Sequence, residues 1–321
     1  MNQIKQTLIG LIVTSIVGII MTYVLKMMEK GEFIVNEHEQ TIKSCIINSN
    51  ELQVTLNDIG GLGKIKDEIQ HTIILPLKYP LAFSSFKMLR QNRGSLFHGP
   101  PGTGKTMLVK AIANESNVPL ISLSASTLES KWFGESNKLI SAAFDVARSI
   151  QPSIIFFDEI DGLGKTRSSF DQSCVSTFKT ELLSKMDGME SKTSDNFFII
   201  GCTNNIVSLD PALKRRLPNQ YNISLPSQED RVNIIKIITS EEKYTIEEIK
   251  LLSEMTANYS GSDLNSLYKR LSNKRLREYF KDEEFIKKMN TTSKMDLEIK
   301  KLDISIWKEE LGFHDDEEQP P

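Results

Sequence analysis

The sequence predicts a doubly wound α/β domain with a parallel sheet, followed by a small all-α lid domain and preceded by one transmembrane helix. Short apolar runs alternate with amphipathic helical patterns over the middle of the chain, which is the order of a βαβ fold. Beyond Pro226 the strand-like runs stop and capped helical segments follow. The expected strands are Ser95–His98, Leu120–Leu123, Ile154–Phe157 and Phe197–Cys202.

An apolar stripe and capping signals place the expected helices. Asn137–Ser149 carries its apolar side chains on one stripe, which predicts a helix packed on the sheet. In the lid domain, the expected N-caps are Ser227, Thr245 (with Glu248 three residues later) and Ser262, the last before a long helix towards Phe280. The expected organisation is residues 1–26 with the transmembrane helix, 27–55 as a polar linker, 56–226 as the α/β domain, and 227–321 as the helical domain with an acidic tail.

The N-terminal segment Leu8–Leu25 contains no charged residue and is flanked by Lys5 and Lys26. At 1.5 Å per residue such a helix is about 27 Å long, just enough to cross a hydrocarbon core. A cleaved secretory signal is less favoured because no small-residue cleavage site follows, and a matrix presequence would need several arginines. The segment is therefore expected to anchor the chain in a lipid bilayer.

Composition excludes some functions. The 321 residues carry a formal net charge of -3, so no basic surface for nucleic acid is indicated. The three cysteines, Cys45, Cys174 and Cys202, are widely spaced, form no metal-ligand cluster and fit a reducing compartment.

A phosphate-binding loop is the strongest motif. It follows an apolar strand and opens the helical run Met107–Ala113, which is the context that a Walker A loop requires. Glycines let backbone N–H groups approach phosphates, Lys105 is expected to reach the β and γ phosphates, and Thr106 to offer its hydroxyl to Mg²⁺. The alternative is a glycine-rich turn without a ligand. The loop residues are Gly99, Pro100, Pro101, Gly102, Thr103, Gly104, Lys105 and Thr106, and Met107 is added to the expected ATP-binding set.

About fifty residues after the phosphate-binding loop, two acids directly follow the expected strand Ile154–Phe157. Asp158 and Glu159 are then expected beside the phosphate-binding loop, because the carboxyl ends of parallel strands meet at one edge of the sheet. Asp158 would hold the Mg²⁺ shell and Glu159 would polarise the attacking water. Simple solvation of the two acids is the alternative.

The motifs together resemble an AAA ATPase module. They occur in the order of that family between about Leu56 and Phe280: Asp58–Leu62 (DIGGL), Gly99–Thr106 (GPPGTGKT), Phe156–Asp161 (FFDEID), Gly201–Asn204 (GCTN), Lys214–Arg216 (KRR) and Ser260–Leu264 (SGSDL). The resemblance implies a homo-hexameric ring with ATP at the subunit interfaces.

The resemblance also implies roles for individual residues. Asn204 matches the sensor that helps to place the water, and Gly60 and Gly261 match positions flanking the adenine. Arg215 and Arg216 match arginine fingers that act on the neighbouring subunit's γ-phosphate. The Asp210-Pro211 pair reads as a helix start, which puts both arginines at the end of a short helix, although a solvated basic face is the alternative.

Two further matches concern contacts between subunits. Asp187-Gly188-Met189 resembles the segment that reports nucleotide state between subunits. The residue after Asn204 is often arginine in the family, whereas here it is Asn205, which puts a local interface contact in doubt.

A loop with two adjacent aromatic residues, Trp132 and Phe133, precedes the Asn137 helix. The matching loop of related ATPases points into the central pore, where its aromatic residues grip the substrate. Ordinary core packing is the alternative. The stretch Arg167–Gln172 occupies the place of a second pore loop.

Within the family, the single anchor, Lys131–Ser136 (KWFGES) and Leu213–Pro218 (LKRRLP) resemble the translocases that extract mislocalised tail-anchored proteins from the mitochondrial outer membrane and peroxisomes. The ATPase domain is expected in the cytosol, because ATP is abundant there, and the resemblance implies membrane-protein substrates. Microtubule-severing ATPases and a non-hydrolysing nucleotide-bound scaffold are the alternatives. A membrane protease is rejected because no H-E-x-x-H motif is present.

Overall fold

The computed structural model describes residues 37–85, 92–124, 136–162, 172–191, 195–242, 244–279 and 302–312. The expected transmembrane segment Leu8–Leu25 lies outside these residues. Among the helices that are described, none has the length and apolar character needed to cross a membrane.

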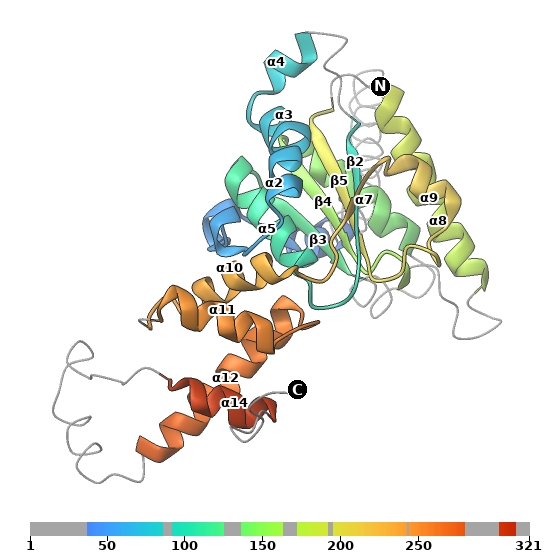
Figure 1. The fold of residues 1–321 in the computed structure, drawn as a ribbon. Coiled ribbons are helices and arrows are strands. Elements are labelled where there is room, and N and C mark those ends of the chain that lie inside the picture. The colour runs from blue at the N-terminus through green and yellow to red at the C-terminus, as the bar shows by residue number, and fades with distance from the viewer. Residues whose placement is uncertain are drawn as a thin grey trace, which may run out of the picture.

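A six-stranded sheet forms the centre of the larger domain (Figure 1). Its order is β1-β3-β4-β5-β2-β6, and every neighbouring pair is parallel except β1 with β3. The strands are β1 (Ile46–Ile47), β2 (Gly94–His98), β3 (Leu120–Ser124), β4 (Ser153–Asp158), β5 (Phe197–Thr203) and β6 (Asn219–Asn222). The doubly wound α/β prediction is confirmed, and all four expected strands are present.

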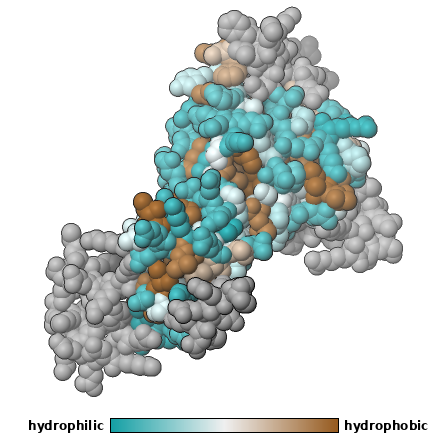
Figure 2. Space-filling view, in the orientation of Figure 1, coloured by the Kyte–Doolittle hydropathy of each residue, from teal (hydrophilic) through white to brown (hydrophobic). Residues whose placement is uncertain are grey.

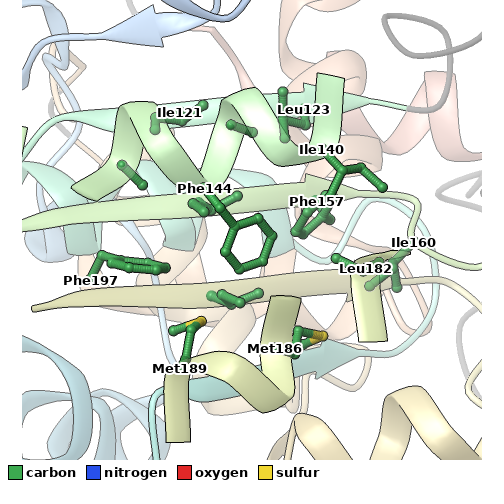
Figure 3. Packing of buried hydrophobic residues seen from close by; sticks show 14 of the residues in the cluster. Ile121, Leu123, Ile140, Phe144, Phe157, Ile160, Leu182, Met186, Met189 and Phe197 are labelled. Carbon is green, nitrogen blue, oxygen red and sulfur yellow. The ribbon is translucent and has the colours of Figure 1, made fainter. Parts of the chain in front are cut away.

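Helices cover both faces of the sheet. Side chains along each central strand point alternately to the two faces, so both faces carry apolar residues that must be covered. Leu96, Ile155 and Phe157 face one apolar cluster, whereas Phe97 and Phe156 face the other. The first cluster is covered by α7 (Ser136–Ser149), α8 (Gln172–Ser191) and α9 (Pro211–Arg216). Figure 3 shows the packing of Phe144, Met186 and Met189 in this cluster, among other residues.

The opposite cluster is covered by α5 (Lys105–Ser116) and by a helix with a π-helical turn, made of α2 (Gly63–Ile69), η3 (Gln70–Ile74) and α3 (Leu75–Lys78). The short helix α4 (Pro80–Ser85) follows it, and two 3₁₀ turns, η1 (Ser49–Glu51) and η2 (Leu56–Asp58), precede it. Residues 37–55, expected as a linker, pack against the domain: β1 extends the sheet, and Ile42 and Leu52 are buried in the two clusters. Their apolar residues are too few for a periodic signal.

The smaller domain contains α10 (Gln228–Ile238), α11 (Ile246–Met255), α12 (Gly261–Tyr279) and α14 (Ile304–Leu311). Ser227 and Thr245 cap α10 and α11 through capping boxes, as expected. The expected cap of α12 is wrong: Ser260, not Ser262, forms the reciprocal hydrogen bonds with Asp263, so the helix begins at Gly261. In Figure 2 hydrophobic surface is visible on this domain and also on the larger domain, in both cases within a largely hydrophilic face.

A buried carboxylate fastens the segment that leads into α14 to the other helices of the smaller domain. The side chain of Glu242, 8% exposed, accepts hydrogen bonds from the Tyr268 hydroxyl at 2.8 Å, Arg275 Nη2 at 3.0 Å and the Leu302 N–H at 2.9 Å. Trp307 of α14 is 1% exposed and stacks on Tyr268. Burial raises the pKa of Glu242, but these hydrogen bonds and the Arg275 charge outweigh it, so the pKa lies below its ordinary value of 4.5.

The Glu242 network yields a stability prediction. We expect Glu242→Gln to lower the free energy of unfolding by about 1–3 kcal/mol at neutral pH, because buried partners lose a charged acceptor. Since the folded pKa is lowered, the carboxylate stabilises the fold above about pH 4.5, and this contribution disappears as the pH falls through the folded pKa. Urea unfolding at several pH values measures the difference. Glu309→Gln is the control, because its pair with Lys274 is exposed and we expect a change below about 0.5 kcal/mol; an equal loss in both variants would contradict the assignment.

Candidate nucleotide-binding site

The phosphate-binding loop joins the carboxyl end of β2 to the start of α5. Gly102 and Gly104 have φ angles of +77° and +96°, a left-handed backbone that glycine adopts without strain. A Cβ on Gly99 would lie 2.0 Å from the Ile223 carbonyl oxygen, so no larger residue fits there. At Gly104, by contrast, none of the residues that the structure describes comes within 4 Å of the Cβ position, so among them the loop has open space on that side for a ligand.

Lys105 lies inside this loop. Its side chain folds back so that Nζ donates to the carbonyl oxygens of Gly99 at 2.9 Å and Pro100 at 2.7 Å, and the residue is 8% exposed. Burial lowers the pKa of Lys105, and the nearby Asp158 and Asp161 carboxylates oppose that shift. The loop therefore holds a cation at the position where a Walker A lysine meets phosphates.

The next residue connects the loop to the strand β4. Thr106 Oγ1 donates a hydrogen bond to Asp158 Oδ2 at 3.0 Å, although the two residues are 52 positions apart. A hydroxyl and a carboxylate are the oxygen ligands that Mg²⁺ accepts from proteins when phosphates and water supply the rest. The donor set thus fits the expected metal ligands Thr106 and Asp158.

Glu159 follows β4 in a left-handed conformation with φ +52°, which is uncommon for a residue with a side chain. Its N–H donates to Asp158 Oδ1 at 3.1 Å, and its carbonyl oxygen accepts from the Gly162 N–H at 2.7 Å. The side chain is exposed. Backbone strain of this kind persists where the surrounding structure fixes it, and here it directs the chain away from the strand immediately after Asp158.

Asn204 is exposed directly after β5, the strand between β4 and β2. The turn behind it is fixed by Thr203, whose hydroxyl donates to Asp161 Oδ1 at 2.7 Å and accepts from the Asn205 N–H at 3.0 Å. The sequence analysis gave Thr203 and Asp161 no separate role. The available signal was a polar residue at the end of β5 and another shortly after the end of β4.

Asn205, where the family often has arginine, has a local structural role. Its Oδ1 accepts hydrogen bonds from the N–H groups of Val207 at 3.0 Å and Ser208 at 3.3 Å. The side chain closes the turn that follows Asn204, as asparagine commonly does.

The expected ATP-binding residues Gly60, Gly261 and Met107 come from three segments, and the first two were expected to flank the adenine. Gly60 lies between η2 and α2, where a Cβ would come within 2.5 Å of the Ile234 backbone nitrogen on α10. Gly261 is the first residue of α12, and the next residue, Ser262, donates its N–H to the Gly102 carbonyl at 3.0 Å. Met107, in the first turn of α5, is 38% exposed. The smaller domain therefore contacts both the Gly60 segment and the phosphate-binding loop.

The two arginines end α9, as expected. Asp210 caps this helix by accepting from the Ala212 N–H at 2.6 Å. Arg215 is exposed, whereas Arg216 pairs with Asp187 of α8 through Nε at 2.7 Å and Nη2 at 2.8 Å. The structure thus gives different surroundings to two adjacent arginines that the sequence motif does not distinguish.

The pore-loop residues Trp132 and Phe133 lie outside the described residues, in the segment between β3 and α7. The same holds for the Arg167–Gln172 stretch, except for Gln172, which begins α8.

Comparison with known proteins places this site in a family. A family model described as "ATPase family associated with various cellular activities (AAA)" matches residues 95–225, which include the phosphate-binding loop, both acids and both arginines. An outer mitochondrial transmembrane helix translocase of Homo sapiens is 37% identical over 246 residues, covering 76% of this chain and 68% of that protein. The chain belongs to the AAA family of ATPases.

The matches to other relatives cover different shares of those proteins' lengths. An outer mitochondrial transmembrane helix translocase of Danio rerio is 37% identical over 249 residues, 77% of this chain and 66% of that protein. The match to the translocases thus spans about two thirds of their length. Spastin of Danio rerio is 40% identical over 226 residues, which is 70% of this chain but 39% of spastin.

Among solved structures, the FIGL-1 AAA domain in complex with ADP has a TM-score of 0.68 and 30% identity. The likeness covers 85% of this chain and 88% of that domain. A related fold has therefore been solved with a nucleotide bound, in agreement with the geometry of the loop.

Proposed function

We propose that this AAA protein hydrolyses ATP within a homo-hexameric ring and uses the energy to extract membrane proteins, in particular tail-anchored proteins, through the central pore. The hydrogen bond between Thr106 and Asp158 is the observation that carries the hydrolysis part. It joins the loop that holds Lys105 to the strand end that presents Glu159, so the groups needed for phosphoryl transfer lie at one edge of the sheet.

Each residue then has a role in positioning or charge stabilisation, which dominate phosphoryl transfer. Lys105 would exchange its two loop carbonyls for β- and γ-phosphate oxygens. Mg²⁺, held by Thr106 and Asp158, would neutralise phosphate charge when bound. Glu159 would orient and deprotonate the attacking water. Asn204 would hold that water from the neighbouring strand end.

The membrane part of the proposal rests on relatives and on the N-terminal sequence. The translocase relatives are named for the outer mitochondrial membrane and for transmembrane helices. Leu8–Leu25 would supply a single-pass anchor, with the ATPase domain in the cytosol, where ATP is abundant. The mitochondrial outer membrane, with or without the peroxisome, is the proposed location.

Microtubule severing is the second candidate, because the spastin relative has the higher identity. That match covers 39% of spastin, whereas the translocase matches cover 66% and 68% of their relatives, so the translocase assignment rests on more of the partner's length. A nucleotide-bound scaffold would bind ATP without steady phosphate release.

The first prediction separates binding from hydrolysis. Glu159→Gln should bind ATP with little change but lose turnover by about 10²-fold or more, because the water loses its base. Lys105→Ala should instead weaken ATP binding, because the phosphates lose their buried cation. Calorimetry with ATP and a phosphate-release assay measure the two effects, with Glu247→Gln, exposed on α11, as the control. Near-normal turnover in Glu159→Gln would rule out its assigned role.

The second prediction tests extraction with the full chain in liposomes that carry a tail-anchored substrate. Trp132→Ala, and less severely Phe133→Ala, should abolish extraction while ATPase activity stays within a few-fold of wild type, because flat apolar side chains grip many sequences without specific hydrogen bonds.

Deleting residues 1–26 should release the ATPase from the membrane.

The competing role for these aromatic residues is core packing, which predicts a loss of about 3–5 kcal/mol and joint failure of folding and ATPase activity. Melting temperature on the same preparations separates the two roles. Full extraction by the double alanine variant would contradict the pore-loop assignment, and stable membrane integration of the truncated chain would contradict the anchor.

A further inference from the structure

The turn between α3 and α4 presents two large apolar side chains to solvent. Tyr79 is 58% exposed and Leu81 is 81% exposed, although Pro76 and Leu77 of α3 are buried in the core just before them. Among the exposed large apolar residues of the described part of the chain, only these two lie within two positions of each other. Single exposed apolar residues are ordinary, but these two form a patch.

The backbone holds this patch in place. The Tyr79 N–H donates to the Leu75 carbonyl oxygen at 2.9 Å, and the Tyr79 carbonyl oxygen accepts from the N–H groups of Ala82 at 3.1 Å and Phe83 at 3.4 Å. Pro80 opens α4 with a backbone that is preset for the first turn of a helix. Hydrogen-bonded helical turns therefore carry the exposed side chains on both sides.

Positive charge accompanies the patch. Lys78, directly before Tyr79, is exposed, and no carboxylate among the residues that the structure describes forms an ion pair with it. The sequence has no acidic residue from Ile69 to Asn114, although the whole chain has a net charge of -3. Exposed tyrosine, leucine and lysine side chains together suit the boundary between lipid headgroups and acyl chains, where the ring and the aliphatic groups are buried and the amine meets phosphate.

The patch also has a suitable position in the molecule. Figure 1 places α4 at the end of the larger domain that lies away from the smaller domain, and Figure 2 shows hydrophobic surface at this end. Eleven residues, 26–36, separate the expected anchor Leu8–Leu25 from Glu37, the first described residue. At full extension they span about 40 Å, so a chain anchored by Leu8–Leu25 keeps this domain close to the bilayer.

We propose that Tyr79 and Leu81 contact the surface of the bilayer in which the chain is anchored, with Lys78 beside the phospholipid phosphates. The inference rests on the proposed anchor and not on the proposed hydrolysis. So small a contact is weak alone, but the anchor makes it intramolecular and raises its effective concentration. It orients the larger domain with α4 towards the membrane and the smaller domain away from it.

A second copy of the chain is the competing occupant of the patch. Specific protein–protein interfaces bury about 1,200 Å² or more, which two side chains and a lysine do not approach. A lipid surface needs no matching shape, so a patch of this size suits it better.

Photocrosslinking of the full chain in nanodiscs of phosphatidylcholine and phosphatidylserine tests the contact. With Leu81→p-benzoylphenylalanine we expect an adduct whose mass increases by one phospholipid after irradiation. Val207, 86% exposed in the turn after β5, is the matched control position and should give little lipid adduct. Tyr79→p-benzoylphenylalanine repeats the test if the Leu81 variant folds poorly. No lipid adduct at position 81, an adduct with a second copy instead, or equal lipid adducts at positions 81 and 207 would overturn the proposal.

The lysine is tested in the same crosslinking protein. Lys78→Ala should lower the lipid adduct by up to about fivefold in phosphatidylserine nanodiscs, which corresponds to roughly 1 kcal/mol for one lysine near an anionic surface. The yield in phosphatidylcholine alone should not change. Lys64→Ala, exposed on α2, is the control and should change neither yield. Equal losses for the two lysine variants would contradict the role of Lys78.

Failure of this inference is distinguishable from failure of the proposed function. Crosslinking needs no ATP turnover, so absent phosphate release from wild type would contradict the ATPase proposal alone. Carbonate extraction of the same nanodisc-forming preparation from liposomes tests the anchor. A chain that resists extraction but gives no lipid adduct at position 81 would contradict the bilayer contact alone.

Discussion

The hydrogen bond between Thr106 and Asp158 is the contact on which the site depends. It exists because β2, β5 and β4 are adjacent and parallel, so the loop after β2 and the acids after β4 emerge at the same edge. The core makes that arrangement rigid: Phe157, one residue before Asp158, is fully buried between the sheet and its covering helices. Any change that moves β4 relative to β2 therefore separates the hydroxyl from the carboxylate.

The smaller domain is attached to this edge by specific contacts. The smaller domain touches the phosphate-binding loop through Ser262 and Gly102, and it approaches the Gly60 segment through α10. On the other face of the sheet, α8 carries α9 through ion pairs at both ends. The smaller domain thus contacts the phosphate-binding loop directly, whereas α9, which carries Arg215, contacts α8.

Much of the fold follows from local sequence. Short apolar runs of four to six residues predicted β2 to β5, and Thr245 with Glu248 predicted α11 correctly. The strand β1 could not be predicted, because two isoleucines give no period and only pairing with β3 makes them a strand. Ser262 was predicted to cap α12, but the cap is Ser260, which only its hydrogen bonds with Asp263 reveal. The binding loop was predicted from its motif, but the different environments of Arg215 and Arg216 depend on Asp187, which is distant in sequence.

A crystal structure of the Glu159→Gln protein with ATP and Mg²⁺ would show whether the phosphates bind at this edge of the sheet. We expect Lys105 Nζ to leave the carbonyl oxygens of Gly99 and Pro100 for β- and γ-phosphate oxygens, and Thr106 and Asp158 both to face the metal. A nucleotide bound elsewhere, with Lys105 still on its two carbonyls, would contradict it.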